Sequence, residues 1–256
     1  MTAAPVSVFV CGVQKGGTTS LHAHFKEHPQ LADPDRKELH FFDNEAIDWR
    51  APDYAMLHRH FKDGRDGIRY DITPITMFWP PAFKRLAAYN PAAKLIFLLR
   101  DPFERAWSHW CMEWARHAET LPFANAIRDG RERLANVGET AKAWRVYSYL
   151  ERGLYAAQIA RALDHFPRDQ MLFLRSADLR DDHMHLLAKI AAFLDIRDFP
   201  ATGIKREHGR AAMDWPAEPT MQDRLLVADF VRQDLAQLGA LTGLDTGDWS
   251  CVRTIA

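Results

Sequence analysis

The sequence predicts a three-layer α/β fold, in which a central parallel sheet is flanked by helices. Short, continuous apolar runs typical of buried strands alternate along the chain with amphipathic helical segments. No internal repeat, low-complexity tract or Pro/Gly/Ser-rich linker interrupts the 256 residues, which are enough for one large core. We therefore expect a single domain over residues 1–256.

The predicted elements follow one another in alternating order. A first strand over residues 6–13 leads through a glycine-rich turn into a helix over residues 18–27, which stops at His28-Pro29. Charged and aromatic residues without clear periodicity predict a loop with a short strand over residues 33–49. Further strands are expected at 68–72, 94–99 and 170–174, and helices at 52–61, 81–89, 102–116, 122–131, 140–150, 154–166, 183–194 and 220–238.

Bulk composition excludes several classes of protein. The chain is 47% hydrophobic and 26% charged with a net charge of −1, so its total charge predicts no attraction to nucleic acid or to a membrane. Three widely spaced cysteines do not predict a disulfide framework. The N-terminus lacks the basic region of a signal peptide, and no run approaches the ~20 apolar residues of a membrane span. We therefore expect a cytoplasmic protein.

Residues 9–21, Phe-Val-Cys-Gly-Val-Gln-Lys-Gly-Gly-Thr-Thr-Ser-Leu, predict a strand, a phosphate-binding loop and the start of a helix. Backbone N–H groups of such a turn, together with the positive end of the helix, bind anions. A nucleoside-triphosphate loop places its lysine after the glycines, whereas Lys15 here precedes them. This order disfavours an ordinary kinase and favours another phosphorylated donor in a P-loop-like fold. The expected donor-binding residues are Gln14, Lys15, Gly16, Gly17, Thr18, Thr19 and Ser20.

A second segment, residues 94–108, contains residues that could bind another phosphate group. Arg100 stands where the predicted strand ends, and Asp101-Pro102 is typical of a helix start, with Asp as cap and Pro in the first turn. Ser108 falls on the second turn of that helix. An arginine at a strand end and a serine inside the next helix can hold one phosphate together.

With these two elements the chain resembles the sulfotransferases that use 3′-phosphoadenosine 5′-phosphosulfate (PAPS). The resemblance implies that the first loop holds the 5′-phosphosulfate and that Arg100 and Ser108 hold the 3′-phosphate. It also implies 3′,5′-adenosine bisphosphate as the product and no required metal. Lys15 would stabilise negative charge on the leaving phosphate.

Residues 37–43, Lys-Glu-Leu-His-Phe-Phe-Asp, contain the candidate bases. In an extended segment Glu38 and His40 point to the same side. The stretch is similar to one in the heparan-sulfate-type branch of the family, where the glutamate is the base and the histidine and aspartate assist. The resemblance thus implies Glu38 as the base, supported by His40 and Asp43. Because the cytosolic branch uses a histidine, His40 is the alternative base.

Three further segments are similar to family elements. Thr73-Pro74 matches a Lys-[ST]-Pro element, but Ile72 stands where the family has its lysine, which argues against a highly acidic acceptor. Tyr155 lies in a Gly-Leu-Tyr segment and is either a ligand contact or a core residue. The basic loop at residues 205–210 resembles one that closes over the 3′-phosphate, which implies Arg206, Gly209 and Arg210 as donor contacts.

These features predict an enzyme that moves a sulfuryl group from PAPS to a hydroxyl or amine of a carbohydrate, lipid or small-molecule acceptor. The alternatives are a P-loop-type small-molecule kinase and a non-catalytic relative that only binds nucleotide. No nucleic-acid partner is expected. The His-x-His pairs at 22/24, 58/60 and 183/185 do not predict a metal site, because residues two apart on a helix do not face each other.

Overall fold

A computed structural model of the chain describes residues 4–62, 67–201, 203 and 215–254. The chain forms two compact units, which are considered separately. Unit 1 comprises Met1–Leu99 and Arg161–Glu207, and unit 2 comprises Arg100–Ala160 and His208–Ala256. The expectation of a single domain remains a prediction.

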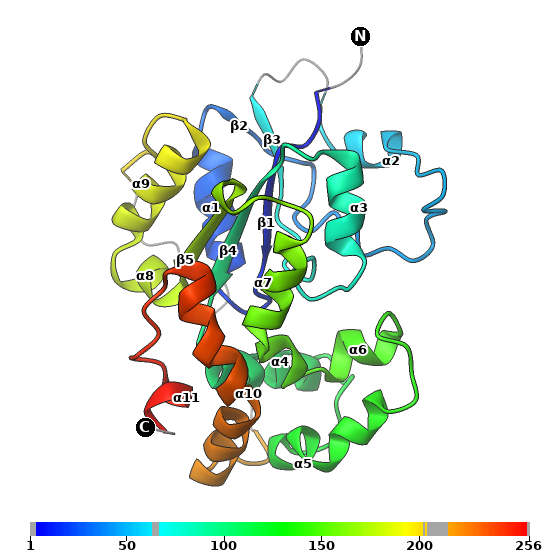
Figure 1. Cartoon of the computed structure of the whole chain (residues 1–256), viewed down its shortest axis with the longest axis vertical. Coiled ribbons are helices and arrows are strands. Elements are labelled where there is room, and N and C mark those ends of the chain that lie inside the picture. Colours follow the sequence, from blue (N-terminus) through cyan, green and yellow to red (C-terminus); the bar gives the residue numbers. More distant parts are fainter. Residues whose placement is uncertain (1–3, 63–66, 202, 204–214, 255–256) are drawn as a thin grey trace. The chain divides into compact units, whose positions relative to one another are not determined.

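Unit 1 contains a five-stranded, entirely parallel sheet with the strand order β2-β3-β1-β4-β5 (Figure 1). The expected alternation of strands and helices is therefore confirmed. Four strands match predicted ones, whereas β2 was not predicted, because two residues give no recognisable pattern and pair with β3 alone. The strands are β1 (Val8–Gly12), β2 (Leu31–Ala32), β3 (Ile68–Asp71), β4 (Lys94–Leu99) and β5 (Met171–Arg175).

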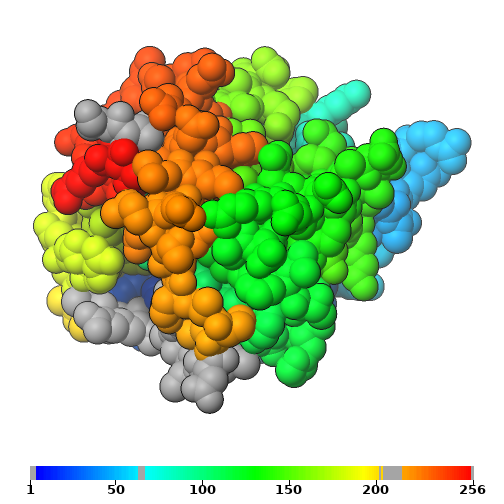
Figure 2. All heavy atoms as spheres, turned by 90° about the horizontal axis from the view of Figure 1, so that it is seen from below, coloured from blue at the N-terminus to red at the C-terminus, as the bar shows by residue number. Residues whose placement is uncertain are grey.

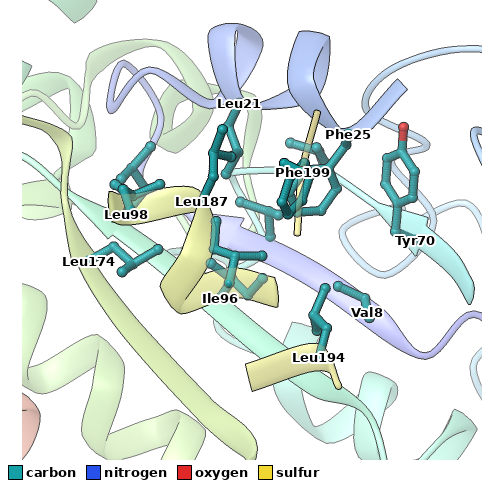
Figure 3. Packing of buried hydrophobic residues seen from close by; sticks show 14 of the residues in the cluster. Val8, Leu21, Phe25, Tyr70, Ile96, Leu98, Leu174, Leu187, Leu194 and Phe199 are labelled. Atoms are coloured by element: carbon teal, nitrogen blue, oxygen red, sulfur yellow. The ribbon is translucent and has the colours of Figure 1, made fainter. Parts of the chain in front are cut away.

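Helices cover both faces of this sheet, which confirms the predicted three layers in unit 1. On one face, Leu21 and Phe25 of α1 and the apolar stripe of α9 pack against Val8, Ile96 and other strand residues (Figure 3). On the other face, α3 brings Phe83 against Phe97, and Phe97 stacks on Phe173 at a centroid distance of 5.0 Å. The helices of this unit are α1 (Thr18–Glu27), α2 (Ala55–His58), α3 (Ala82–Tyr89), α8 (Ser176–Asp181) and α9 (His183–Leu194), with the short turn η3 (Arg168–Gln170).

The order of the strands defines where a ligand can bind in unit 1. After β1 the chain builds β2 and β3 on one side of β1, and it then crosses to build β4 and β5 on the other side. Ligands of open parallel sheets bind outside the carboxyl ends of the strands, at such a switch point. The loop that follows Gly12 begins at this position.

Unit 2 is helical. Asp101 caps α4, since its carboxylate accepts a hydrogen bond from the Glu104 N–H at 3.0 Å, as the sequence predicted. On the same helix Trp107 stacks on Trp110 at 4.9 Å, and both rings are buried. The helices are α4 (Pro102–Ala115), α5 (Phe123–Ile127), α6 (Lys142–Tyr147), α10 (Met221–Thr242) and α11 (Ser250–Arg253), with the turns η1 (Asp129–Leu134) and η2 (Glu151–Gly153); α7 (Tyr155–Leu163) starts in unit 2 and ends in unit 1.

Some predicted elements were wrong. In unit 1 the helix expected at 52–61 is only Ala55–His58, and the described residues 33–49 contain no strand. In unit 2 the bounds of two helices differ. The helices expected at 122–131 and 140–150 are shorter, and a 3₁₀ turn replaces the end of the first. Ion pairs hold these short pieces instead: Arg128 bonds Asp223 at 2.8 Å, and Figure 2 shows the first turns of α10 (orange) beside the green segment that carries α5 and α6. Within the described part of the chain, no helix is both long and apolar enough to cross a membrane.

Candidate active site

The loop between β1 and α1 runs against the end of β4. The Val13 N–H donates to the Leu98 carbonyl at 3.0 Å, and the Gly16 N–H donates to the Val13 carbonyl at 2.9 Å. A Cβ on Gly16 would lie only 2.6 Å from the Leu98 oxygen, so no larger residue fits there. Gly17 has a φ of +94°, which strongly favours glycine, and Lys15 has a φ of +70°. Loop and strand are thus packed backbone to backbone.

The N-terminus of α1 begins at this loop, with Gly17 as its N-cap. No side chain caps the helix, and its first turn contains no acidic residue. The first N–H groups of a helix have no partner within the helix, and the helix dipole makes this end positive. A tight glycine loop followed by such an uncapped helix end fits a phosphate group. Gln14, Lys15, Thr19 and Ser20 are partly exposed here, whereas Gly16 and Thr18 are buried.

Glu38, His40 and Asp43 form a chain of charged contacts after β2. His40 Nδ1 lies 2.9 Å from Asp43 Oδ2, and His40 Nε2 lies 3.4 Å from Glu38 Oε2. Lys37 Nζ donates to the other oxygen of Glu38. The side chains of Glu38 and His40 are 36% and 47% exposed, whereas Asp43 is buried. Glu38 thus lies between two cations with part of its carboxylate open to solvent.

These contacts shift the pKa values of Glu38 and His40 in opposite directions. Burial raises the pKa of Glu38, but hydrogen bonds from His40 and the Lys37 ammonium outweigh burial and bring the pKa to about 2. Hydrogen bonds to Asp43 and Glu38 raise the pKa of His40 to about 9. At neutral pH, Glu38 is therefore a carboxylate and His40 an imidazolium that donates from both ring nitrogens.

An extended backbone was expected at Glu38 and His40, and this expectation was wrong. Both residues have left-handed backbones, with φ values of +62° and +51°. Leu39 between them is buried, 3% exposed, while its neighbours reach solvent. The two side chains do face each other, but a tight turn places them there instead of strand alternation.

Asp71 and Thr73, at the end of β3, bind the backbone of the turn at residues 38–40. The Leu39 N–H donates to Asp71 Oδ1 at 3.2 Å, and the His40 N–H donates to Thr73 Oγ1 at 3.4 Å. The Thr73 hydroxyl lies 2.8 and 2.9 Å from the two oxygens of Asp71. Burial raises the pKa of Asp71 to about 6, against the hydrogen bonds from Thr73 and Leu39.

Ile72 lies between these two polar residues and faces the core. Its side chain is 1% exposed and belongs to the apolar cluster that Leu21 and Ile96 share. No cation therefore stands at the position that corresponds to the family lysine. Among the described residues, no group of three or more His, Cys, Asp or Glu side chains has an arrangement that could hold a metal ion.

Arg100 and Ser108 belong to unit 2. Arg100 lies just before the α4 cap, and its guanidinium is 31% exposed and 3.4 Å from Glu104. Ser108 is partly exposed on the second turn of α4. Tyr155 is fully buried, and its hydroxyl donates to the Arg100 carbonyl at 2.7 Å. Tyr155 was expected to be either a ligand contact or a core residue, and its burial supports the core residue.

Some site residues were missed, and others cannot be located. Asp71 and Lys37 were not assigned roles. For Asp71 the available signal was a carboxylate between Tyr70 and Ile72 in the strand predicted at 68–72. Arg206, Gly209 and Arg210, expected over the 3′-phosphate, lie outside the described residues.

Fold and site together are those of an α/β group-transfer protein, with a glycine-rich loop at residues 13–17 (the anion loop), an uncapped helix end and an ionised carboxylate. Residues 5–200 match the family model described as "Sulfotransferase domain". The chain therefore belongs to the sulfotransferase family, as its sequence motifs predicted.

Several known proteins are similar to this chain over half of its length or more. Mouse heparan sulfate glucosamine 3-O-sulfotransferase 3A1 is 28% identical over 93% of this chain, which spans 63% of that protein. The membrane-associated sulfotransferase kil1 of Dictyostelium discoideum is 32% identical over 51% of this chain and 28% of its own length. The crystal structure of a sulfotransferase from Alicyclobacillus acidocaldarius superimposes with a TM-score of 0.76 at 26% identity, covering 97% of this chain and 99% of that one.

Proposed function

We propose that this protein is a PAPS-dependent sulfotransferase that uses Glu38 as its base. The observation that carries the proposal is the pairing of Glu38 with His40 next to the strand that ends in the anion loop: β1 and β3 are adjacent, and Asp71 of β3 binds the turn that carries both side chains. Family membership supports the reaction type, and the uncapped α1 terminus supports a phosphorylated donor.

The donor supplies the sulfuryl group, and its 3′,5′-bisphosphate is the leaving group. In the proposed mechanism Glu38 takes the proton from the acceptor hydroxyl as its oxygen bonds to sulfur. Lys15 and the N–H groups of residues 16–20 stabilise the charge that develops on the leaving phosphate. Arg100 and Ser108 bind the 3′-phosphate.

The charges at the site favour Glu38 over His40 as the base. With a pKa of about 9, His40 already carries its proton at neutral pH and cannot accept another. Its role in the proposal is to hold Glu38 ionised and oriented, while Asp43 orients the imidazolium. A shift of the Lys37 ammonium from Glu38 towards a bound substrate would raise the pKa of Glu38 and make it a stronger base.

The acceptor in this proposal carries a hydroxyl or an amine. The similarity to heparan sulfate glucosamine 3-O-sulfotransferases favours a carbohydrate. Ile72, which contributes no positive charge, favours an acceptor less acidic than heparan sulfate. Lipid and small-molecule alcohols complete the panel of acceptors to be tested.

The experiment combines calorimetry with turnover. We expect 3′,5′-adenosine bisphosphate to bind without Mg²⁺ and more tightly than ATP or ADP, and labelled PAPS to sulfate a member of a panel of heparan sulfate, neutral oligosaccharides and small alcohols. Stronger ATP binding would contradict the proposal in favour of a kinase. Bisphosphate binding without turnover on any acceptor would indicate the non-catalytic relative.

Two substitutions test the assigned roles. Glu38→Gln should lower turnover by about 10²- to 10⁴-fold while bisphosphate binding stays within about twofold. Arg100→Ala should weaken bisphosphate binding and leave the affinity for adenosine 5′-phosphosulfate, which lacks the 3′-phosphate, unchanged. Full turnover of Glu38→Gln, or equal losses for both nucleotides in Arg100→Ala, would remove the residue concerned from its role.

A further inference from the structure

The turn that carries Glu38 and His40 has an unfavourable local conformation. Left-handed backbones at residues other than glycine each cost about 1–3 kcal/mol when held in place, and two of them flank Leu39. Such a turn persists only where its surroundings determine it. The turn is therefore expected to depend on a small number of strong contacts from neighbouring elements.

Two hydrogen bonds from consecutive N–H groups provide such contacts. The Leu39 N–H donates to Asp71, and the His40 N–H donates to Thr73. These two acceptors lie two residues apart at the end of β3. β3 pairs with β2 at its start and with β1 at its end, where Asp71 is in register with Phe9, so the backbone of Asp71 is fixed in the sheet. The side chain of Leu39 is buried as well, which ties the middle of the turn to the core.

Asp71 is an unusual residue for this place. It is only 2% exposed, with Tyr70 and Ile72 buried on either side of it in the sequence, and burying a carboxylate is costly unless it is hydrogen-bonded. Its carboxylate accepts hydrogen bonds from the Thr73 hydroxyl and the Leu39 N–H. The carboxylate therefore acts on the turn both directly and through Thr73.

We propose that Asp71 and Thr73 are positioning residues, which fix the backbone of residues 38–40 so that Glu38 and His40 lie within hydrogen-bonding reach. The effect on turnover rests on the proposed function, whereas the effect on the contact between Glu38 and His40 does not. Neither side chain needs to touch donor or acceptor for this role. Loss of the Thr73 hydroxyl removes the acceptor for the His40 N–H and one of the bonds that orient Asp71.

Thr73→Val is the main test, because it removes the hydroxyl and keeps the shape of the side chain. Thr73→Ser restores the hydroxyl and is the rescue variant. Thr242→Val is the matched control, since Thr242 is a buried threonine whose hydroxyl bonds the Leu238 carbonyl of α10 at 2.7 Å. Asp71→Asn complements these variants by removing the charge at nearly constant volume.

The first readout needs no enzyme activity. NMR titration gives the pKa of His40, whose signal is identified by its loss in His40→Gln. In Thr73→Val this pKa should fall from about 9 towards the ordinary histidine value, because Glu38 and the imidazolium separate, and Thr73→Ser should keep it near about 9. An unchanged pKa in Thr73→Val, or equal falls in the valine and serine variants, would overturn the proposal.

The second readout is kinetic, with the acceptor that the wild type sulfates fastest. Thr73→Val and Asp71→Asn should lower kcat by about 10- to 100-fold with bisphosphate affinity within about twofold, while Thr73→Ser and Thr242→Val stay close to wild type. A loss of kcat in Thr242→Val as large as that in Thr73→Val would mean a merely structural effect. A wild type that neither binds the bisphosphate nor turns over would refute the proposed function, and the titration would still decide the positioning role.

Discussion

Alanine at Gly16 tests whether the anion loop depends on close backbone packing. The added Cβ would lie 2.6 Å from the Leu98 oxygen and 2.9 Å from the Val13 oxygen, whereas ordinary van der Waals contact begins at 3.4 Å. Both are backbone atoms, and the Leu98 carbonyl is already fixed in β4 and bonded to the Val13 N–H. The loop must therefore move by ~0.8 Å, because the strand cannot.

Two opposing effects set the change in the free energy of unfolding that we expect for Gly16→Ala. Overpacking a tightly packed site costs about 1–3 kcal/mol. Replacing glycine by alanine also lowers the conformational entropy of the unfolded chain, which stabilises the folded protein by about 0.4–1 kcal/mol. We expect Gly16→Ala to lower the free energy of unfolding by about 1–2 kcal/mol. Displaced N–H groups should also weaken the binding of 3′,5′-adenosine bisphosphate by about tenfold or more.

Two further alanine variants distinguish the steric effect of the added Cβ from the effect of an unfavourable backbone conformation. Gly17 offers room for a Cβ, with a nearest neighbour at 3.4 Å, but its φ of +94° should cost about 1–3 kcal/mol. Gly138 has no atom within 4 Å and no positive φ, so Gly138→Ala should be neutral or slightly stabilising. Urea denaturation and calorimetry measure all three. A Gly16→Ala protein as stable as Gly138→Ala, with undiminished bisphosphate affinity, would refute the reasoning.

Two more predictions concern charge and backbone support. The raised pKa of His40 means that its bonds to Glu38 and Asp43 stabilise the fold fully below about pH 6.5 and that this contribution is lost as the pH rises through about 9. The stability deficit of His40→Gln in urea should therefore shrink between pH 6 and pH 10, and a constant deficit would exclude a charged imidazole. Tyr155→Phe removes the 2.7 Å hydrogen bond that holds the Arg100 carbonyl, so bisphosphate should bind about tenfold more weakly. Adenosine 5′-phosphosulfate should bind as before; an equal loss for this nucleotide would count against the link to Arg100.

Local sequence was sufficient for the elements whose signals are themselves local. β4 and α9 have the predicted bounds, because a continuous apolar run and a 3.6-residue period each require only their own residues. The anion loop was predicted for the same reason, since a strand, two glycines and a helix start follow one another directly. The cap at Asp101 is equally local.

Local sequence predicted helices around α5 and α6 but not their lengths, and it did not predict strand β2. β2 exists through its pairing with β3, and the pieces around α5 and η1 are held by side chains distant in sequence, such as Asp223 with Arg128. A window of residues around β2 does not include β3, and a window around Arg128 does not include Asp223. These elements therefore depend on tertiary contacts more than on local propensity.

The sequence by itself determined the family, the parallel α/β fold and the residue types of the candidate site: a lysine in a glycine loop, and a glutamate, a histidine and an aspartate within six positions. Only the tertiary structure decided how Glu38 and His40 meet. Their contact requires a left-handed turn, and that turn is held by Asp71 and Thr73, more than thirty residues away along the chain. Hydrogen bonds between distant segments leave no periodicity in the sequence, so only the folded chain shows them.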